Sequence, residues 1–150
     1  MSSTLTNLLV HVVFSTKGRE PIIASDCGGR LYSYIGGIIR SEGAEPLAIG
    51  GTADHLHLAV KIGADQALSD LVRKVKANSS RWANDKRLAK GKFAWQNGYG
   101  GFSVSASQIG KVRSYTRNQE KHHRTKTFKE EMLGILRKHG VECEPKYLWD

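Results

Sequence analysis

Short apolar segments alternate with longer amphipathic segments along the chain, and their order limits the folds open to it. Runs of β-branched and aliphatic residues are typical of strands, whereas apolar residues repeated every three or four positions indicate helices. By these patterns strands are predicted at 5–16, 45–51 and 55–62, with one or two more inside 92–105 around a Gly-rich turn at 97–101, and helices at 25–43, 66–87, 107–123 and 127–140. The first six elements follow the order β-α-β-β-α-β. We therefore expect an α+β fold with a ferredoxin-like or RRM-like antiparallel sheet, helices on one face and added C-terminal helices.

The ends of the predicted elements carry their own signals. Ser25 or Asp26 is expected to cap the first helix, and Gly43 is expected to end it. The first strand is apolar on both faces, so we expect it to be buried on both. The tail at 141–150 is expected to be extended. No internal repeat, low-complexity segment or linker divides the sequence, so 1–150 is interpreted as a single domain.

The charge of the chain indicates the class of its partner. It carries 23 lysines and arginines against 14 aspartates and glutamates, a net charge of +9, with a pI near 9.7. This favours nucleic acid, and a membrane surface is disfavoured because no basic segment has a clean apolar face.

Cys27 and Cys143 lack metal-type spacing and are expected to be reduced. The N-terminus has no signal-peptide pattern, and its apolar run at 8–14, interrupted by His11, is too short to span a bilayer, so we expect a cytoplasmic protein.

Two histidines, His55 and His57, lie in the apolar segment HLHLAVKI with one leucine between them. Alternate residues of a strand point to the same face, so both imidazoles should face one side while Leu56 and Leu58 face the other. Two imidazoles at this spacing can bind one metal ion; the alternative is a pair of core-edge histidines. Asp54 is interpreted as a third ligand, an outer partner or a turn cap. The pair supplies too few ligands, so another segment must contribute.

A second polar cluster lies in GKVRSYTRNQEKHH, at 110–123. Tyr115 and Gln119 are four residues apart and would share one face of a helix. A glutamine amide oxygen can bind a hard metal ion, and a deprotonated tyrosine is a nucleophile. Positive charge suited to phosphates surrounds them, from Lys111, Arg113, Arg117 and Lys121. Taken alone, Tyr115 is better explained as a packing residue of an amphipathic helix.

Together these segments resemble the single-tyrosine HUH transposases of bacterial insertion sequences, which move as single-stranded DNA and are related to the repeat-associated tyrosine transposases. The resemblance rests on DHLHLAV followed by VRSYTRNQEKHH, and it extends over LLVHVVFSTKGRE, LSDLVRKVKANSSRW, FAWQNGYGGFSVS and KYLWD. It implies that His55, His57 and Gln119 bind Mg²⁺ or Mn²⁺ and that Tyr115 is the nucleophile. Imidazole ligands by themselves favour Mn²⁺ or Zn²⁺.

The resemblance also implies a reaction and an assembly. Cleavage of single-stranded DNA at hairpin-bearing ends would give a 5′-phosphotyrosine, and reversal of the attack would rejoin strands without ATP. The active unit would be a homodimer in which the tyrosine helix of one subunit serves the histidine pair of the other. A close variant of this function is a domesticated, repeat-associated transposase.

Basic side chains and one serine hydroxyl are candidate DNA contacts, with a solvated helix face as the alternative. They are Arg73, Lys74, Lys76, Ser79 and Arg81, together with Arg113 and Arg117. A replication initiator or relaxase fits less well in motif order and size. A non-catalytic RRM-like module would require RNP-type aromatics on the sheet, which HVVFST and HLHLAVKI do not have.

Overall fold

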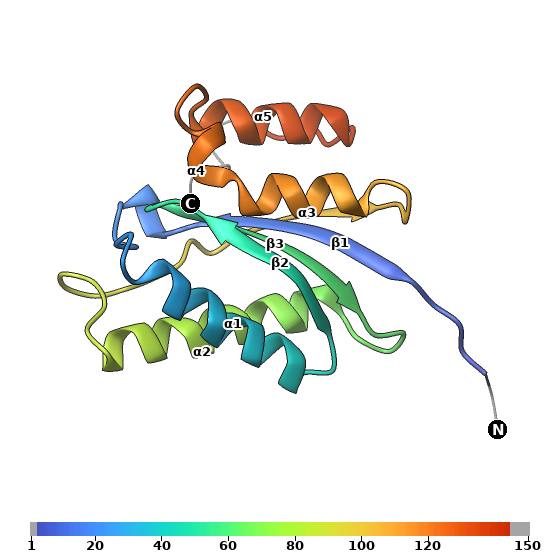
Figure 1. Ribbon diagram of the computed structural model, residues 1–150, viewed down its shortest axis with the longest axis horizontal. Coiled ribbons are helices and arrows are strands. Elements are labelled where there is room, and N and C mark those ends of the chain that lie inside the picture. The colour runs from blue at the N-terminus through green and yellow to red at the C-terminus, as the bar shows by residue number, and fades with distance from the viewer. Residues whose placement is uncertain (1–2, 145–150) are drawn as a thin grey trace.

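A four-stranded antiparallel sheet forms the centre of the computed structural model, which describes residues 3–144 (Figure 1). The strands are β1 (Leu8–Ser15), β2 (Glu45–Gly51), β3 (His55–Ile62) and β4 (Gly100–Val104), in the spatial order β2-β3-β1-β4. β1 and β3 occupy the middle and pair along their whole length. The predicted α+β fold with an antiparallel sheet is therefore confirmed.

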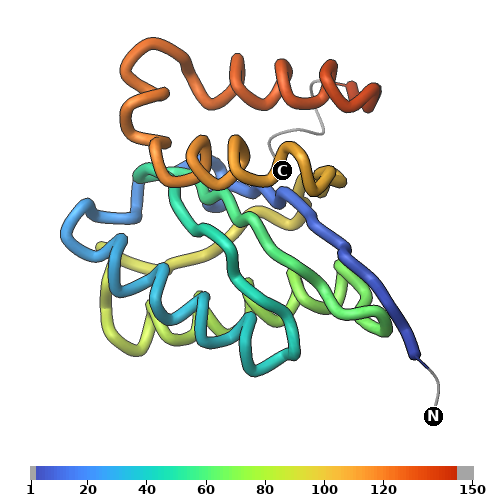
Figure 2. Tube along the Cα trace, turned by 45° about the vertical axis from the view of Figure 1, so that its right-hand side comes forward, coloured from blue at the N-terminus to red at the C-terminus, as the bar shows by residue number. Residues whose placement is uncertain are grey.

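Helices cover both faces of this sheet (Figures 1 and 2). α1 (Gly28–Ser41) and α2 (Leu68–Asp85) pack on one face, while α3 (Ile109–Arg117), α4 (Gln119–His122) and α5 (Phe128–Lys138) lie over the other, and a 3-10 turn (Lys17–Arg19) follows β1. The larger apolar core lies under α1 and α2, and a smaller one lies under α5. The C-terminal helices thus turn a two-layer fold into a three-layer one. The described part of the chain contains no helix long and apolar enough to cross a bilayer.

The segment predicted as one helix at 107–123 forms two helices, α3 and α4, that meet at Asn118. The Asn118 backbone leaves the helical region, with φ −102° and ψ 29°, and its side-chain amide donates to the carbonyl oxygen of Ser114 at 2.8 Å. Such a local side-chain bond competes with the helical hydrogen-bond ladder. The prediction of a single helix is therefore wrong by one break.

The glycines predicted to form a turn at 97–101 have a different role at two positions. Gly100 and Gly101 begin β4, where a Cβ on Gly100 would lie 2.7 Å from Cε of Met132 and one on Gly101 would lie 2.8 Å from Cδ2 of Leu68. Side chains from both helical layers therefore press on this end of β4. The glycines permit close packing here, which the sequence alone does not distinguish from a turn.

The ends of the other elements lie close to their predicted positions. α1 begins at Gly28 with Cys27 in the N-cap position, so neither Ser25 nor Asp26 caps it. Gly43 follows the last turn with a φ of 85°, the left-handed conformation that ends many helices. Residues 141–144 form no helix or strand, and the rest of the predicted extended tail lies outside the described residues.

Candidate active site

The histidine pair lies on the face of β3 that the C-terminal helices cover. His55 and His57 are both fully buried, at 0% exposure, and Leu56 and Leu58 point to the opposite face, into the core under α1 and α2. The predicted alternation is confirmed. Because β3 pairs with a strand on each side, the imidazoles lie in the interior of the sheet, where each ring nitrogen needs a polar partner.

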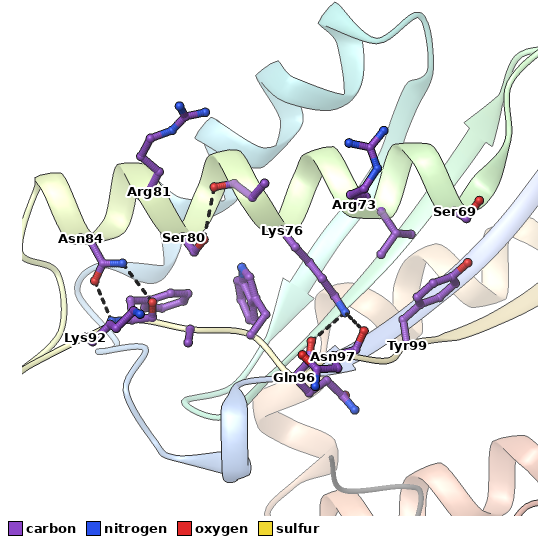
Figure 3. Close-up of a pocket in the computed structure, with 15 residues that line it drawn as sticks. Ser69, Arg73, Lys76, Ser80, Arg81, Asn84, Lys92, Gln96, Asn97 and Tyr99 are labelled. Carbon is purple, nitrogen blue, oxygen red and sulfur yellow. Dashed lines mark hydrogen bonds between the residues drawn. The ribbon is translucent and has the colours of Figure 1, made fainter.

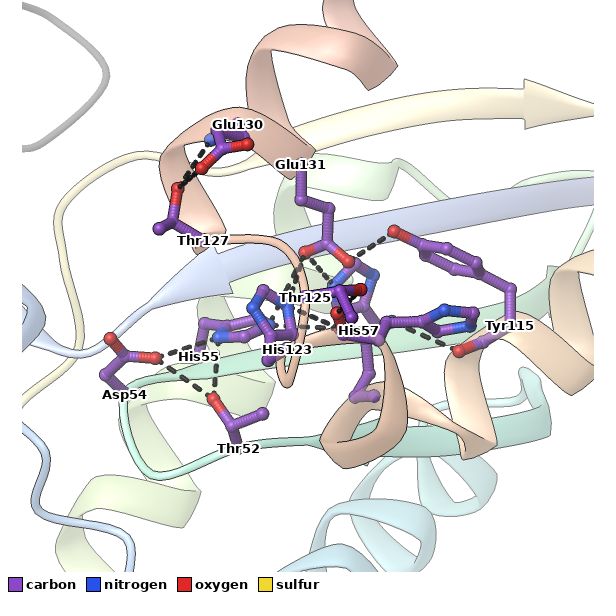
Figure 4. A network of polar contacts seen from close by, with 12 residues as sticks. Thr52, Asp54, His55, His57, Tyr115, His123, Thr125, Thr127, Glu130 and Glu131 are labelled. Carbon is purple, nitrogen blue, oxygen red and sulfur yellow. Dashed lines mark hydrogen bonds and ion pairs between the residues drawn. The ribbon is translucent and has the colours of Figure 1, made fainter.

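The two ring nitrogens of His55 contact different groups. Its Nδ1 lies 2.9 Å from Oδ1 of Asp54 and 2.9 Å from Oγ1 of Thr52 (Figure 4). Its Nε2 lies 3.1 Å from Oε1 of Gln119 and 3.5 Å from Oε1 of Glu131. Burial opposes the charged form, but the hydrogen bonds to Asp54 and Glu131 outweigh it and raise the pKa of His55 to about 9. Asp54 thus occupies the outer-partner position among its predicted roles.

His57 has a second imidazole behind it. Its Nδ1 lies 2.8 Å from Nε2 of His11, which is on the neighbouring strand β1, and its Nε2 lies 2.9 Å from Oε1 of Glu131. Burial, helped by the nearby His57, lowers the pKa of His11 to about 3. Burial also lowers the pKa of His57, against the opposing effect of Glu131. Both rings are therefore neutral at pH 7.

Tyr115 and Gln119 reach this cluster because α3 packs closely on β2. A Cβ on Gly50 would lie 2.0 Å from the carbonyl oxygen of Thr116, so only glycine allows α3 to come this near. The ring of Tyr115 then lies 5.7 Å from that of His57. Gln119 is buried and donates from Nε2 to the carbonyl oxygen of Tyr115 at 3.1 Å. The predicted pair therefore stays together despite the helix break between its members.

Glu131 of α5 completes the cluster and is absent from the predicted ligand set. It is 1% exposed; its Oε1 contacts His57, and its Oε2 accepts a hydrogen bond from the Tyr115 phenol (Figure 4). Burial favours the neutral acid, but hydrogen bonds from the two histidines outweigh it and hold the pKa of Glu131 well below its usual range. The sequence does carry a signal, because Glu131 lies on the apolar side of its helix, between Phe128 and Met132.

Two further contacts affect the reactive groups. His123 lies 3.2 Å from Oε1 of Gln119 and 3.2 Å from Oε1 of Glu131. Burial, together with the contact to anionic Glu131, raises the pKa of Tyr115. The phenol is therefore protonated at neutral pH, and it donates a hydrogen bond to Glu131.

Four polar atoms converge at the centre of the cluster: Nε2 of His55, Nε2 of His57, Oε1 of Gln119 and Oε1 of Glu131. The separations among them include 2.9 Å, 3.1 Å and 3.5 Å. Ligands about 2.0–2.2 Å from one ion lie about 3–3.5 Å from each other. The two histidines and Glu131 also form a buried group with metal-binding spacing. The residues present therefore fit a divalent ion.

The predicted DNA contacts on α2 divide into exposed and buried side chains. Ser79 is fully buried and its Oγ accepts a hydrogen bond from Nε1 of Trp95 at 2.9 Å, so the prediction that it contacts DNA is wrong. Lys76 turns its ammonium toward the carbonyl oxygens of Gln96 and Asn97 (Figure 3) and also toward that of Gly98, and burial lowers its pKa to about 8. Its position identifies Lys76 as an anchor for the loop before β4.

The other predicted contacts lie on two different faces. Arg73 and Arg81 are exposed at a groove of about 620 Å³ between α2 and residues 92–99, and Lys74 forms an ion pair with Glu42 at 2.7 Å (Figure 3). The remaining two, Arg113 and Arg117, belong to α3 on the opposite side of the sheet. The candidates therefore do not form one continuous surface.

Comparison with known proteins gives one matching family, one similar protein of known sequence and two similar solved structures. The family described as "Transposase IS200 like" matches residues 4–119. The ISDra2 transposase TnpA of Deinococcus radiodurans is 23% identical over 114 residues, which cover 73% of this chain and 81% of that protein.

Two solved structures share the fold. A Deinococcus radiodurans R1 protein described as a transposase has a TM-score of 0.63 at 22% identity, covering 79% of this chain and 95% of that one. A REP-associated tyrosine transposase bound to a REP hairpin has a TM-score of 0.62 at 14% identity, covering 82% of this chain and 74% of that one.

Proposed function

Because the chain belongs to the IS200-like transposase family, we propose that it cleaves and rejoins single-stranded DNA through a covalent bond to Tyr115. The observation that carries this proposal is the contact of the Tyr115 phenol with a buried carboxylate that also contacts the histidine pair. The substrate is DNA with hairpins at the ends of a mobile element. The solved transposase that shares this fold was bound to a REP hairpin, which supports a hairpin as the ligand.

The proposed metal ligands are His55, His57 and Gln119, with Glu131 as a fourth. A divalent ion held there would act as a Lewis acid on the scissile phosphate. Two imidazoles and two oxygen atoms suit Mn²⁺, and the oxygen atoms also suit Mg²⁺.

Tyr115 performs the covalent step, and Glu131 orients its phenol by accepting its hydrogen bond. The phenol releases its proton to water as its oxygen attacks the phosphorus in line with the leaving group. A bond forms between the tyrosine oxygen and phosphorus while the bond from phosphorus to the 3′ oxygen breaks. The 3′ oxygen takes up a proton and leaves as a hydroxyl. A 3′-hydroxyl attacking the phosphotyrosine reverses these steps, so no ATP is consumed.

Basic residues bind the strand by its phosphates. Lys111 lines the cavity beside the tyrosine, Arg117 and Lys121 are exposed elsewhere on α3 and α4, and Arg73 and Arg81 are exposed on α2. Binding through many such contacts weakens steeply as salt is added.

We also propose a cytoplasmic, single-domain protein that acts as a homodimer with shared sites. In one chain Tyr115 lies beside its own histidine pair, so sharing requires α3 to leave its close packing at Gly50. Mixing inactive Tyr115→Phe with inactive His57→Ala tests this. Under verified subunit exchange, restored cleavage supports shared sites, and a dead mixture assigns each site to a single chain.

The decisive experiment incubates the protein with a hairpin-bearing single strand and Mn²⁺ or Mg²⁺. We expect a covalent protein–DNA band on a denaturing gel, lost on chelation and in Tyr115→Phe, which lacks only the phenolic oxygen. Tyr34→Phe, at an exposed tyrosine of α1, is the matched control and should form the band. An adduct formed by Tyr115→Phe would assign the nucleophile to another residue.

The DNA that flanks the coding sequence distinguishes the two variants of this function. A mobile element is bounded by hairpins, whereas a domesticated copy lies among scattered repeats.

A further inference from the structure

A cavity of about 600 Å³ opens beside the tyrosine, between β4, α3 and α5. Tyr115 and Glu131 lie in its lining, and α3 and α5 run side by side above the sheet in both views of the chain (Figures 1 and 2). The volume is in the range of sites for small organic ligands, roughly 300–1,000 Å³. The cavity is separate from the groove at α2, which lies on the other face of the sheet.

The lining combines apolar walls with a cationic rim. Val112 of α3 and Ile135 of α5 supply half-buried aliphatic surface on the two helical walls. Three exposed lysines supply the positive charge: Lys111, Lys126 and Lys138. Glu131 is the one acidic residue among the described lining residues, and it is buried against the histidines. A planar apolar ligand that carries negative charge at one end matches this arrangement.

One wall also has an unused space. Gly134 lies in the middle of α5, where glycine lowers helix stability relative to alanine, and a Cβ built on it would meet nothing within 4 Å. A side chain could fit there without a clash with any residue from 3 to 144, so packing among the described residues does not explain the glycine. Its absence of a side chain keeps the wall of the cavity open.

We propose that this cavity is the subsite for one nucleotide of the DNA strand, the one next to the scissile phosphate. The base inserts between Val112 and Ile135, and the neighbouring phosphates face the lysines of the rim. The exposed amide of Gln108 and hydroxyl of Ser103, also in the lining, are positioned to bond the edge of a base. The inference rests on the proposed function, because it takes Tyr115 as the attacking group.

Filling the cavity is the first test. Gly134→Phe should slow adduct formation on the hairpin strand about tenfold or more, the loss expected when one stacked base is displaced. Gly37→Phe makes the same change at an exposed mid-helix glycine of α1, where a Cβ also meets nothing, and should react at the wild-type rate. Hairpin affinity should stay within about twofold in both variants, because it depends on many phosphate contacts.

An abasic scan identifies the nucleotide. Removing single bases on either side of the cleavage position should slow the wild-type reaction about tenfold at one position. In Gly134→Phe the same lesion should cause no further loss, since both changes remove one interaction. The proposal would be overturned if the lesion slowed Gly134→Phe by the same factor as it slows the wild-type protein. It would also be overturned if Gly134→Phe reacted with the intact strand at the wild-type rate. If Gly134→Phe unfolds, Gly134→Leu, which places a smaller, helix-favouring side chain in the same space, takes its place with the same expectations.

Photocrosslinking separates this inference from the proposed chemistry. A strand carrying 5-iododeoxyuridine next to the cleavage position, bound to Tyr115→Phe, should crosslink to peptides from 103–112 or 134–139. Crosslinks there without any adduct from the wild-type protein would support the subsite and refute the cleavage. Adducts from the wild-type protein with crosslinks only to α2 would support the cleavage and refute the subsite.

Discussion

His55 and His57 lie two residues apart on one face of β3, and in both rings Nδ1 points away from the centre of the cluster. The group that this Nδ1 contacts differs between the two histidines. Nδ1 of His55 faces the carboxylate of Asp54, whereas Nδ1 of His57 faces the imidazole of His11. Hydrogen bonds to Asp54 and to Glu131 raise the pKa of His55 to about 9, while burial keeps His57 and His11 neutral. The two imidazoles that we propose as metal ligands are thus held in two protonation states.

The difference has a consequence for metal binding. With Glu131 anionic, Nε2 of His57 donates a proton to it, so Nδ1 accepts one from Nε2 of His11. An ion at Nε2 requires that proton to move to Nδ1, and the neutral His11 ring can then act as the acceptor. His55 must instead lose a proton outright, because both of its nitrogens are protonated below pH 9. One ligand changes its tautomer and the other releases a proton.

Removing the ligands themselves should have the largest effect. We expect His55→Ala, His57→Ala and Gln119→Ala each to reduce metal-dependent cleavage by more than the roughly 10–100-fold that loss of an outer partner costs. Hairpin affinity, measured by anisotropy, should change little because phosphate contacts dominate it. Equal losses in cleavage and affinity would mean that these side chains are structural.

Replacing Asp54 and His11, the groups that contact Nδ1 of each histidine, tests whether the two partners contribute differently to metal binding. Asp54→Asn keeps an acceptor for Nδ1 of His55 but removes the charge, so at pH 9.5, where no proton competes for His55, affinity for Mn²⁺ should fall about 10–100-fold. His11→Gln exchanges one neutral group that can donate or accept for another and should cost less. Titration with Mn²⁺, followed by electron paramagnetic resonance, measures both, with wild-type protein as reference. A larger loss in His11→Gln would reverse the comparison.

The two halves of this site differ in how far the sequence predicts them. The bounds of β2 and β3 and the shared face of His55 and His57 follow from local alternation, and the structure reproduces them. Glu131 and His11 belong to other elements, and their contacts depend on how those elements pack. Each had one local signal, a polar residue within an apolar face or run.

The error at Ser79 has a local cause. Ser79 is four residues after Val75 and four before Ala83, so it lies on the inner stripe of α2 with two buried apolar residues. Because its side chain is small and polar and its neighbours are basic, Ser79 is easily taken for an exposed residue. Helical periodicity, applied residue by residue, would have placed it in the core beside Trp95.

The pH dependence of metal binding should show the proton that His55 releases. Because the pKa of His55 is about 9, its Nε2 is occupied by a proton at neutral pH. The affinity for Mn²⁺ should therefore rise about tenfold per pH unit between pH 7 and 9. Calorimetry in buffers of different ionisation enthalpy should detect close to one proton released at pH 7. An affinity that is flat over this range would show that His55 is already neutral.

The smallest effect is expected in the stability of the metal-free protein, where the two histidine environments oppose each other. His11 has a folded pKa of about 3, below its unfolded value near 6.5, so the unfolded chain binds more protons between these values and stability rises with pH. His55 has a folded pKa of about 9, so above pH 6.5 the folded chain binds more protons and stability falls. Each slope is at most about 1.4 kcal/mol per pH unit, and the lowered pKa of His57 adds to the slope on the acidic side.

The free energy of unfolding, measured with urea in the presence of a chelator, should therefore peak near pH 6.5. Asp54→Asn should flatten the alkaline side and leave the slope between about pH 4.5 and 6.5 unchanged, because the carboxylate raises the pKa of His55 and is not among the causes of the lowered values of His11 and His57. A peak that keeps its alkaline side in Asp54→Asn would mean that Glu131, shared by both rings, holds the proton on His55.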